Sequence, residues 1–287
     1  MNHNHANYEL RIDFIQDLMR TTFTINGETQ VTPIAYEADC PLKYNNFVYR
    51  VTLPSATSSS IHVADKPGCV AVPAGTPNLV VRLTNADADG MNKKNRVENE
   101  VAVISLVSAA LANYEPKVVP AVYGWASAAA AGSQGWILQQ LMPGTPADAA
   151  LDEMDLEGKR GVFLQMAGML GAIQRYKLPP SIAGYGGVMF DPNGQIVSAE
   201  MSSVEAGPWA SYEDSFRGRL EIALARAETN QLIQGWRRNA VRERVQAFVD
   251  NGLPAQLSSL PSKHDRVVVH GDFSKLSRLI FRFVLSR

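Results

Sequence analysis

The chain has 287 residues, of which 46% are hydrophobic and 19% charged, a composition typical of soluble globular proteins with a substantial core. Its formal net charge of -1 gives no electrostatic reason to expect binding to nucleic acid or to an acidic membrane. No apolar run approaches the ~20 residues of a membrane-spanning helix. The first residues lack the basic and apolar regions of a signal peptide, so a cytoplasmic location is the default expectation. Cys40 and Cys69 are far apart and are predicted to be reduced.

The N-terminal part of the chain predicts a helix that follows a polar extension. Apolar residues recur at helical spacing over 8–19. The residues ahead of this helix include His3 and His5, which could bind a metal, although a disordered polar terminus is the commoner explanation. Thr24–Glu28 then has the pattern of a strand that runs into an Asn-Gly turn.

A series of strands is predicted next, from runs of β-branched and aromatic residues at 47–51, 78–83, 118–125 and 135–142. A stretch rich in Ser, Ala, Pro and Gly at 55–77 is interpreted as a surface insertion. The last strand ends in Pro-Gly-Thr-Pro at 143–146. Neither a strand nor a helix passes through such a sequence, which therefore indicates a hinge, although from this segment alone a simple loop at the strand end is the preferred explanation.

A helix is expected over 92–111, and it carries an acidic residue on its apolar face. That face consists of Val97, Val101, Ile104, Val107 and Leu111. Glu100 lies on this face, whereas Glu98 is displaced to the polar side. Because an unpaired buried carboxylate is costly, we expect Glu100 to pair with Arg82 on the preceding strand. A solvated Glu100 is the alternative.

The pattern becomes mostly helical after residue 147. A helix expected over 156–176 is followed by a hairpin at Asp191–Gly194 and by helices over 212–228 and 234–249. The core face of the first helix is predicted to consist of Phe163, Met166, Leu170 and Ile173. Arginines on the outer faces of the later helices are interpreted as solvated: Arg217, Arg219, Arg226, Arg237 and Arg238.

Near its end the chain reads Val267-Val268-Val269-His270-Gly271-Asp272. The valines predict a short strand buried on both faces, and the glycine allows a sharp turn that presents Asp272 at the strand end. Loops that leave rigid strands commonly carry reactive groups. On its own the motif is weak, and a turn aspartate beside a buried His270 also explains it.

His-Gly-Asp after an apolar strand resembles the catalytic loop of the aminoglycoside phosphotransferase family, relatives of choline kinases and, more remotely, of protein kinases. The resemblance covers residues 30–274, and Arg96–Val101 is similar to fungal-type members. It implies an α+β, two-lobed, protein-kinase-like fold. The expected parts are an N-terminal helix and extension, a nucleotide-binding lobe, a hinge and a mostly helical lobe, at 1–29, 30–138, 139–146 and 147–287.

The resemblance also implies a function, the transfer of the ATP γ-phosphate to a hydroxyl of an unidentified small molecule, with ATP and Mg²⁺ as cofactors. Asp272 would align the attacking hydroxyl, Arg82 would hold phosphate, and Glu100 would orient Arg82. Further nucleotide-binding positions would lie in the phosphate-covering turn and in the hinge, at Asn46, Gln140 and Leu141. A plain β-hairpin explains the first of these segments equally well.

The resemblance ends after Ser274. The family pattern places a metal-binding Asn five residues after the catalytic Asp, where this chain has Ser277, and a second metal-binding Asp would lie beyond Arg287. The expectation is therefore an incomplete C-terminal lobe that lacks most metal ligands and transfers phosphate poorly or not at all. The alternative function is a catalytically inactive kinase-fold remnant that binds a nucleotide or a protein partner.

Overall fold

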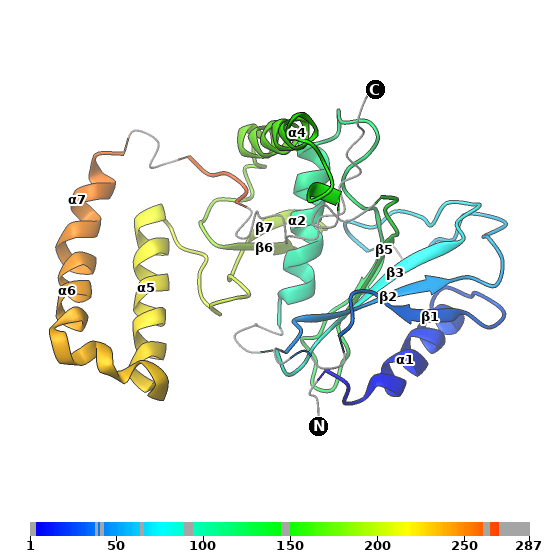
Figure 1. Cartoon of the computed structure of the whole chain (residues 1–287), viewed down its shortest axis with the longest axis horizontal. Helices are drawn as coiled ribbons and strands as arrows, with labels where there is room; N and C mark the ends of the chain where they lie inside the picture. Colours follow the sequence, from blue (N-terminus) through cyan, green and yellow to red (C-terminus); the bar gives the residue numbers. More distant parts are fainter. Residues whose placement is uncertain are drawn as a thin grey trace.

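The centre of the molecule is one antiparallel sheet with the strand order β1-β2-β3-β5-β4 (Figure 1). Its strands are β1 (Gln30–Pro33), β2 (Asn46–Thr52), β3 (Asn78–Thr84), β4 (Val122–Ala126) and β5 (Trp136–Gln140). They belong to a computed structural model that describes residues 4–37, 40, 43–63, 66–88, 94–144, 150–260 and 265–269. An antiparallel sheet accompanied by separate helices confirms the predicted mixture of α and β structure.

The two faces of the sheet pack against different helices, because side chains alternate along each strand. One face packs against α1 (Tyr8–Thr21), and this core contains Ile15, Tyr49, Leu79 and Leu138. The other face packs against α2 (Arg96–Ala110), and its core consists of Val97, Val101, Val122, Trp125 and Ile137. Successive residues of β5, such as Ile137 and Leu138, therefore pack into the cores on opposite faces of the sheet.

The N-terminal helix is confirmed, but two predictions around it are wrong. Residues 4–7 are not a disordered terminus, since the Asn4 carboxamide accepts from the backbone N–H of Tyr44 at 2.9 Å and His5 Nδ1 lies 2.7 Å from the Tyr36 hydroxyl. His3 lies outside the described residues. The strand predicted at 24–28 does not form. Phe23 is fully buried, and the chain then turns through Thr24 at φ 51°, a left-handed conformation that a strand does not contain.

The segment at 55–77 is more than a surface insertion, because it covers the outer edge of β4. The backbone N–H of Val70 donates to the carbonyl of Val122 at 2.9 Å, and Lys66 Nζ donates to the carbonyl of Trp125 at 2.7 Å. Val72 is 1% exposed and belongs to the core on the α1 side. Composition alone suggested a solvated loop, but a composition does not show that backbone groups, the Lys66 side chain and a few apolar side chains make these contacts.

Cys69 in this segment should react slowly with alkylating reagents. Burial raises the pKa of its thiol to about 11, although Lys66 nearby lowers it. Because only the thiolate reacts, a Cys40→Ser variant at about pH 8 should be alkylated on the order of 100-fold more slowly when folded than in urea, where the thiol pKa is about 8.5. The folded-state rate should rise about tenfold per pH unit while the pH stays below the raised pKa. Equal folded and unfolded rates, measured by mass spectrometry, would contradict the burial.

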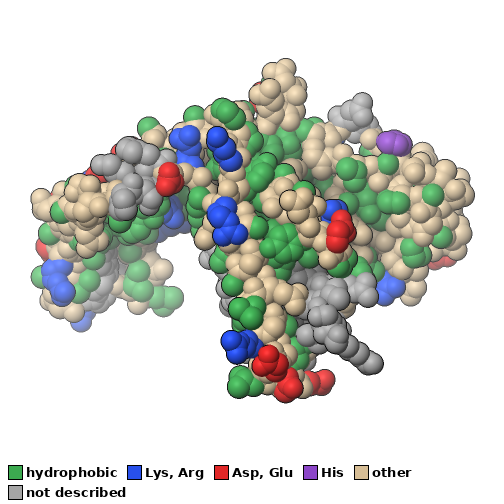
Figure 2. All heavy atoms as spheres, turned by 90° about the horizontal axis from the view of Figure 1, so that it is seen from above, with side chains coloured by type: hydrophobic (Ala, Val, Ile, Leu, Met, Phe, Trp, Pro, Cys, Tyr) green, Lys and Arg blue, Asp and Glu red, His purple; other side chains and the backbone are tan. Residues whose placement is uncertain are grey.

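The helix predicted at 156–176 is confirmed as α4 (Leu156–Arg175), but its core face is rotated. The buried residues are Val162, Met169 and Ile173, whereas Phe163 is 54% exposed. Met169 and Ile173 pack against Leu111 at the end of α2, which determines the face that turns inward. Seen from above, the side on which α4 lies in Figure 1, hydrophobic side chains are interspersed with isolated charges (Figure 2).

The predicted hairpin is confirmed as β6 (Gly187–Phe190) and β7 (Ile196–Ala199). The Asp191 carboxylate accepts from the N–H of Asn193 at 2.9 Å and from that of Gln195 at 2.8 Å, which closes the turn. The hairpin packs against the face of α2 that carries Ala102 and Leu106.

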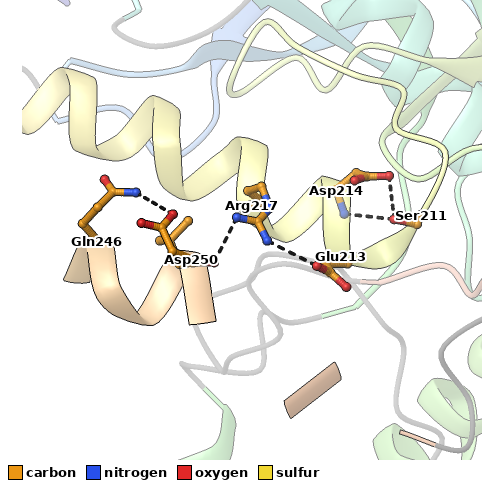
Figure 3. Close-up of polar contacts among 7 residues, drawn as sticks. Ser211, Glu213, Asp214, Arg217, Gln246 and Asp250 are labelled. Atoms are coloured by element: carbon orange, nitrogen blue, oxygen red, sulfur yellow. Dashed lines mark hydrogen bonds and ion pairs between the residues drawn. The ribbon is translucent and has the colours of Figure 1, made fainter. Parts of the chain in front are cut away.

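The last helices form a unit that lies apart from the sheet in Figure 1. It comprises α5 (Tyr212–Thr229), the 3-10 helix η1 (Gln231–Asn239), α6 (Val241–Ala247), the short π-helix η2 (Phe248–Gly252) and α7 (Leu253–Ser258). The second predicted helix begins late, because Ala240 is left-handed at φ 57°. Arg217 is not simply solvated. Its guanidinium donates to the Val249 carbonyl at 3.0 Å and to Glu213 at 3.2 Å, and so joins α5 to η2 (Figure 3).

The strand predicted at the valine triplet is absent. Residues 265–269 pair with none of the described strands, and Val267 and Val269 are 42% and 74% exposed. Only Val268 packs against the core, beside α2 and α4. Residues 270–287, which include Asp272 and Ser277, lie outside the described residues, as do Thr145 and Pro146 of the predicted hinge. None of the described helices is long and apolar enough to cross a membrane.

Candidate functional site

An ion pair between the sheet and α2 forms the centre of the candidate site. Arg82 lies in β3, between Val48 of β2 and Ile137 of β5, and its side chain is on the α2 face. Its guanidinium pairs with the Glu100 carboxylate on α2, and the two side chains are 28% and 25% exposed. The pairing expected from the apolar face of the helix is therefore present. Partial burial strengthens such a pair relative to one in water.

Arg96, the first residue of α2, completes the site and was missed as a functional residue by sequence reasoning. It is only 4% exposed. One terminal nitrogen donates to the Asn85 carbonyl at 3.3 Å, and the other donates to the Asn46 carboxamide oxygen at 3.0 Å and to the Asn45 carbonyl. The available signal was its position one helical turn before Glu100, on the same face of α2.

The electrostatics of the site favour an anionic ligand. Burial lowers the pKa of the Arg96 guanidinium, while Glu100 raises it and Arg82 lowers it. Two guanidiniums thus share one neighbouring carboxylate, which leaves an excess of positive charge. In addition, the buried Nε of Arg82 has no hydrogen-bond partner among the described residues. Guanidinium groups of this kind pair well with phosphate or carboxylate.

The other positions predicted to bind nucleotide do not all lie close to the ion pair. Asn46 lies at the start of β2, and its carboxamide oxygen already accepts from Arg96. Gln140 ends β5; its backbone N–H donates to the Ala121 carbonyl at 2.8 Å, and its side chain accepts from the Ala121 N–H at 3.3 Å. Leu141 follows and is half-buried. The structure therefore gathers Asn46, Arg82 and Glu100 around Arg96, and places Gln140 and Leu141 farther along the sheet.

Two further buried polar atoms, one on β5 and one on α2, were also not anticipated. Gln139 shares the sheet face of Ile137, and therefore that of Arg82, and its buried carboxamide oxygen has no partner in the described part of the chain. Glu98, expected on the polar side of α2, likewise has one buried carboxylate oxygen without a described partner. Since buried polar groups are normally satisfied, both atoms mark places where a polar ligand group or an ordered water would be stabilised.

No group of three His, Cys, Asp or Glu side chains suited to a metal ion forms within the described ranges. The prediction of Mg²⁺ therefore stays a prediction. A cavity of about 290 Å³ lies next to the site, along the segment that joins β1 to β2, and Asn46 is one of its lining residues, with Tyr36, Tyr44 and Phe47.

Comparison with known proteins decides the family. Residues 70–275 match the model of the family described as phosphotransferase enzyme family. The chain belongs to this family. The matched segment contains Arg82, Glu100, Gln140 and Asp272, whereas Asn46 precedes it. Membership of this family supports a kinase-like phosphotransfer function.

Two of the solved structures that resemble this chain are of WbdD. One is described as the bifunctional kinase-methyltransferase, with 14% identity, 73% of this chain and 45% of that chain covered, and a TM-score of 0.23. The other, a co-crystal structure of WbdD with the kinase inhibitor LY294002, has 14% identity, coverages of 74% and 46%, and a TM-score of 0.21. This chain thus spans less than half of the WbdD chain, and TM-scores this low support no conclusion about fold or substrate. No curated protein matches the chain.

Proposed function

We propose that the protein binds the phosphates of ATP at the α2 face of its sheet and transfers the γ-phosphate to a hydroxyl of a small molecule. The observation that carries this proposal is the Arg82–Glu100 ion pair. In kinases, a strand cation must be held by a helix glutamate to contact the phosphates. Glu100 fixes the Arg82 guanidinium in the same way, and the neighbouring Arg96 adds positive charge.

In the proposed reaction the hydroxyl oxygen of the acceptor forms a bond to the γ-phosphorus. The bond from that phosphorus to the oxygen bridging it to the β-phosphorus breaks, and ADP leaves. Asp272 would orient the hydroxyl and accept its proton, while Arg82 would offset charge on the phosphates. Mg²⁺, when bound, supplies further neutralisation of that charge. Catalysis of this type rests mainly on positioning and charge stabilisation.

The finer features of the family resemblance belong to the same proposal. The sheet with α1 and α2 would form the nucleotide-binding lobe, and the helices after the hinge at 139–146 would form the second lobe. Since the N–H of Gln140 already donates to the Ala121 carbonyl, Leu141 is the stronger candidate for the adenine contact. The fungal-type character of Arg96–Val101 and the incomplete C-terminal lobe remain predictions.

Titration calorimetry with ATP tests the proposed site. Arg82→Ala is expected to weaken ATP binding by about ten- to a hundredfold, because a hydrogen bond to a charged group contributes about 1.5–3 kcal/mol. Arg20→Ala is the matched control. Arg20 lies on α1, on the opposite side of the sheet, where its side chain is 75% exposed and pairs with Asp17, so ATP affinity should not change.

The titration, together with an assay of phosphate transfer, distinguishes the possibilities. Absence of ATP binding by the parent protein, or equal losses in the two variants, would refute the assignment of the site. Binding without phosphate transfer to any acceptor would favour the inactive remnant instead. Melting temperatures of both variants establish that each one is folded.

A further inference from the structure

We propose that Arg96 is a positioning residue for the nucleotide phosphates: it fastens the turn that precedes β2 to the helix that carries Glu100. The inference rests on the proposed function. It adds a residue that neither the His-Gly-Asp motif nor the Arg82–Glu100 ion pair identifies. If the turn covers the phosphates, its distance from Arg82 must be fixed, and Arg96 is the side chain that joins the two.

The hydrogen bonds of Arg96 span three elements. The guanidinium belongs to the first turn of α2, and its acceptors are Asn45 and Asn46 at the start of β2 and Asn85 just after β3. The acceptors are also bonded to each other, since the Asn85 N–H donates to the Asn45 carbonyl at 3.1 Å, and the Asn85 carboxamide donates to the Tyr44 carbonyl at 2.7 Å. The turn, the end of β3 and α2 therefore behave as one unit.

Arg96 joins these segments with a charged guanidinium, although burying a neutral side chain would cost less free energy. Its acceptors are two carbonyls and a carboxamide, and no carboxylate of the described residues forms an ion pair with Arg96. A buried cation without such a pair carries a desolvation penalty. An anionic group next to Arg82 and Glu100 would offset that penalty, because it would lie within the field of both guanidiniums. A polyphosphate has this chemistry.

The fork of the guanidinium matters as much as its charge. Two terminal nitrogens reach acceptors on separate segments of the chain, whereas a lysine ammonium is a single point that cannot hold both. Arg96→Lys thus keeps the charge and removes the positioning. Small displacements of binding groups are costly in phosphoryl transfer, where about 1 Å can cost on the order of a hundredfold.

The test compares ATP with adenosine, using titration calorimetry on the full chain. In Arg96→Lys, the Kd for ATP is expected to rise by about ten- to a hundredfold, the size of one lost hydrogen bond to a charged phosphate group, while the Kd for adenosine stays unchanged, because the positioned groups contact phosphate alone. Arg217→Lys is the control. It makes the same substitution at a guanidinium that also joins a carbonyl and a side-chain oxygen, in the helical unit shown in Figure 3, and it should lower the melting temperature without changing either Kd.

A second measurement keeps the inference testable if Arg96→Lys folds poorly. Asn46→Ala removes one of the three acceptors and should produce a smaller loss that is again confined to ATP. Where Arg96→Lys does fold, its effect should shrink in the double variant, since the two residues act through one contact. Equal losses for ATP and adenosine, no loss for either, or additive losses in the double variant would overturn the positioning role. A parent protein that binds neither ligand would instead refute the proposed function.

Discussion

Replacement of Asp272 by alanine is expected to lower the rate of phosphate transfer by about 10²–10⁴-fold, because a positioned proton acceptor contributes roughly that factor. ATP affinity should be retained, since the carboxylate is assigned to the acceptor hydroxyl and not to the phosphates. Turnover by the parent protein is itself expected to be weak, because Ser277 replaces the metal-binding Asn of the family pattern. The measurement is therefore a single-turnover assay with γ-labelled ATP and a panel of aminoglycosides, choline and sugars.

Asp17→Ala provides the control for this assay. It also removes one carboxylate, but from an exposed position on α1 where Asp17 pairs with Arg20, and it should leave transfer unchanged. Transfer that survives Asp272→Ala would show that another group accepts the proton. Transfer that is absent in the parent while ATP still binds would establish the inactive alternative.

Met169→Ala is expected to reduce the free energy of unfolding by about 2–5 kcal/mol, the usual cost of truncating a large buried side chain. Met169 is 3% exposed and packs with Leu111 and Ile173 between α4 and α2. Phe163→Ala, which removes a larger side chain that is 54% exposed, should cost only about 0.5 kcal/mol. Urea unfolding followed by circular dichroism gives both values. The reverse order would mean that α4 presents the face predicted from sequence.

The helix α4 shows why a correct element can have a wrong core face. Its existence follows from apolar periodicity, but two adjacent stripes satisfy that periodicity and share Met166 and Ile173. Choosing between Phe163 and Val162 requires the position of the neighbouring helix, which no local pattern contains. Val267–Val269 fails for a similar reason, because β-branched residues form a strand only beside a partner strand.

In the candidate site, too, one feature could be predicted from the sequence and another could not. The Arg82–Glu100 pair was predictable, because a carboxylate on an apolar helix face demands a cation and the preceding strand offers one. Arg96 was not, since its acceptors are mainly backbone carbonyls, and every residue has a backbone carbonyl. The distant partner at Asn45 is 51 residues away in the chain, so only the folded structure connects the two.

The place of β5 in the sheet has a consequence for biosynthesis. β5 is the last of the five strands to be translated, yet it lies between β3 and β4. While the segment between residues 84 and 136 is being made, roughly 3–10 s at about 5–20 residues per second, the apolar β3 has an unpaired edge and β4 has no neighbouring strand. Exposed edges of this kind associate with other chains. We therefore expect the nascent chain to associate most readily with other chains during this interval, until Trp136–Gln140 has emerged and can pair with β3 and β4.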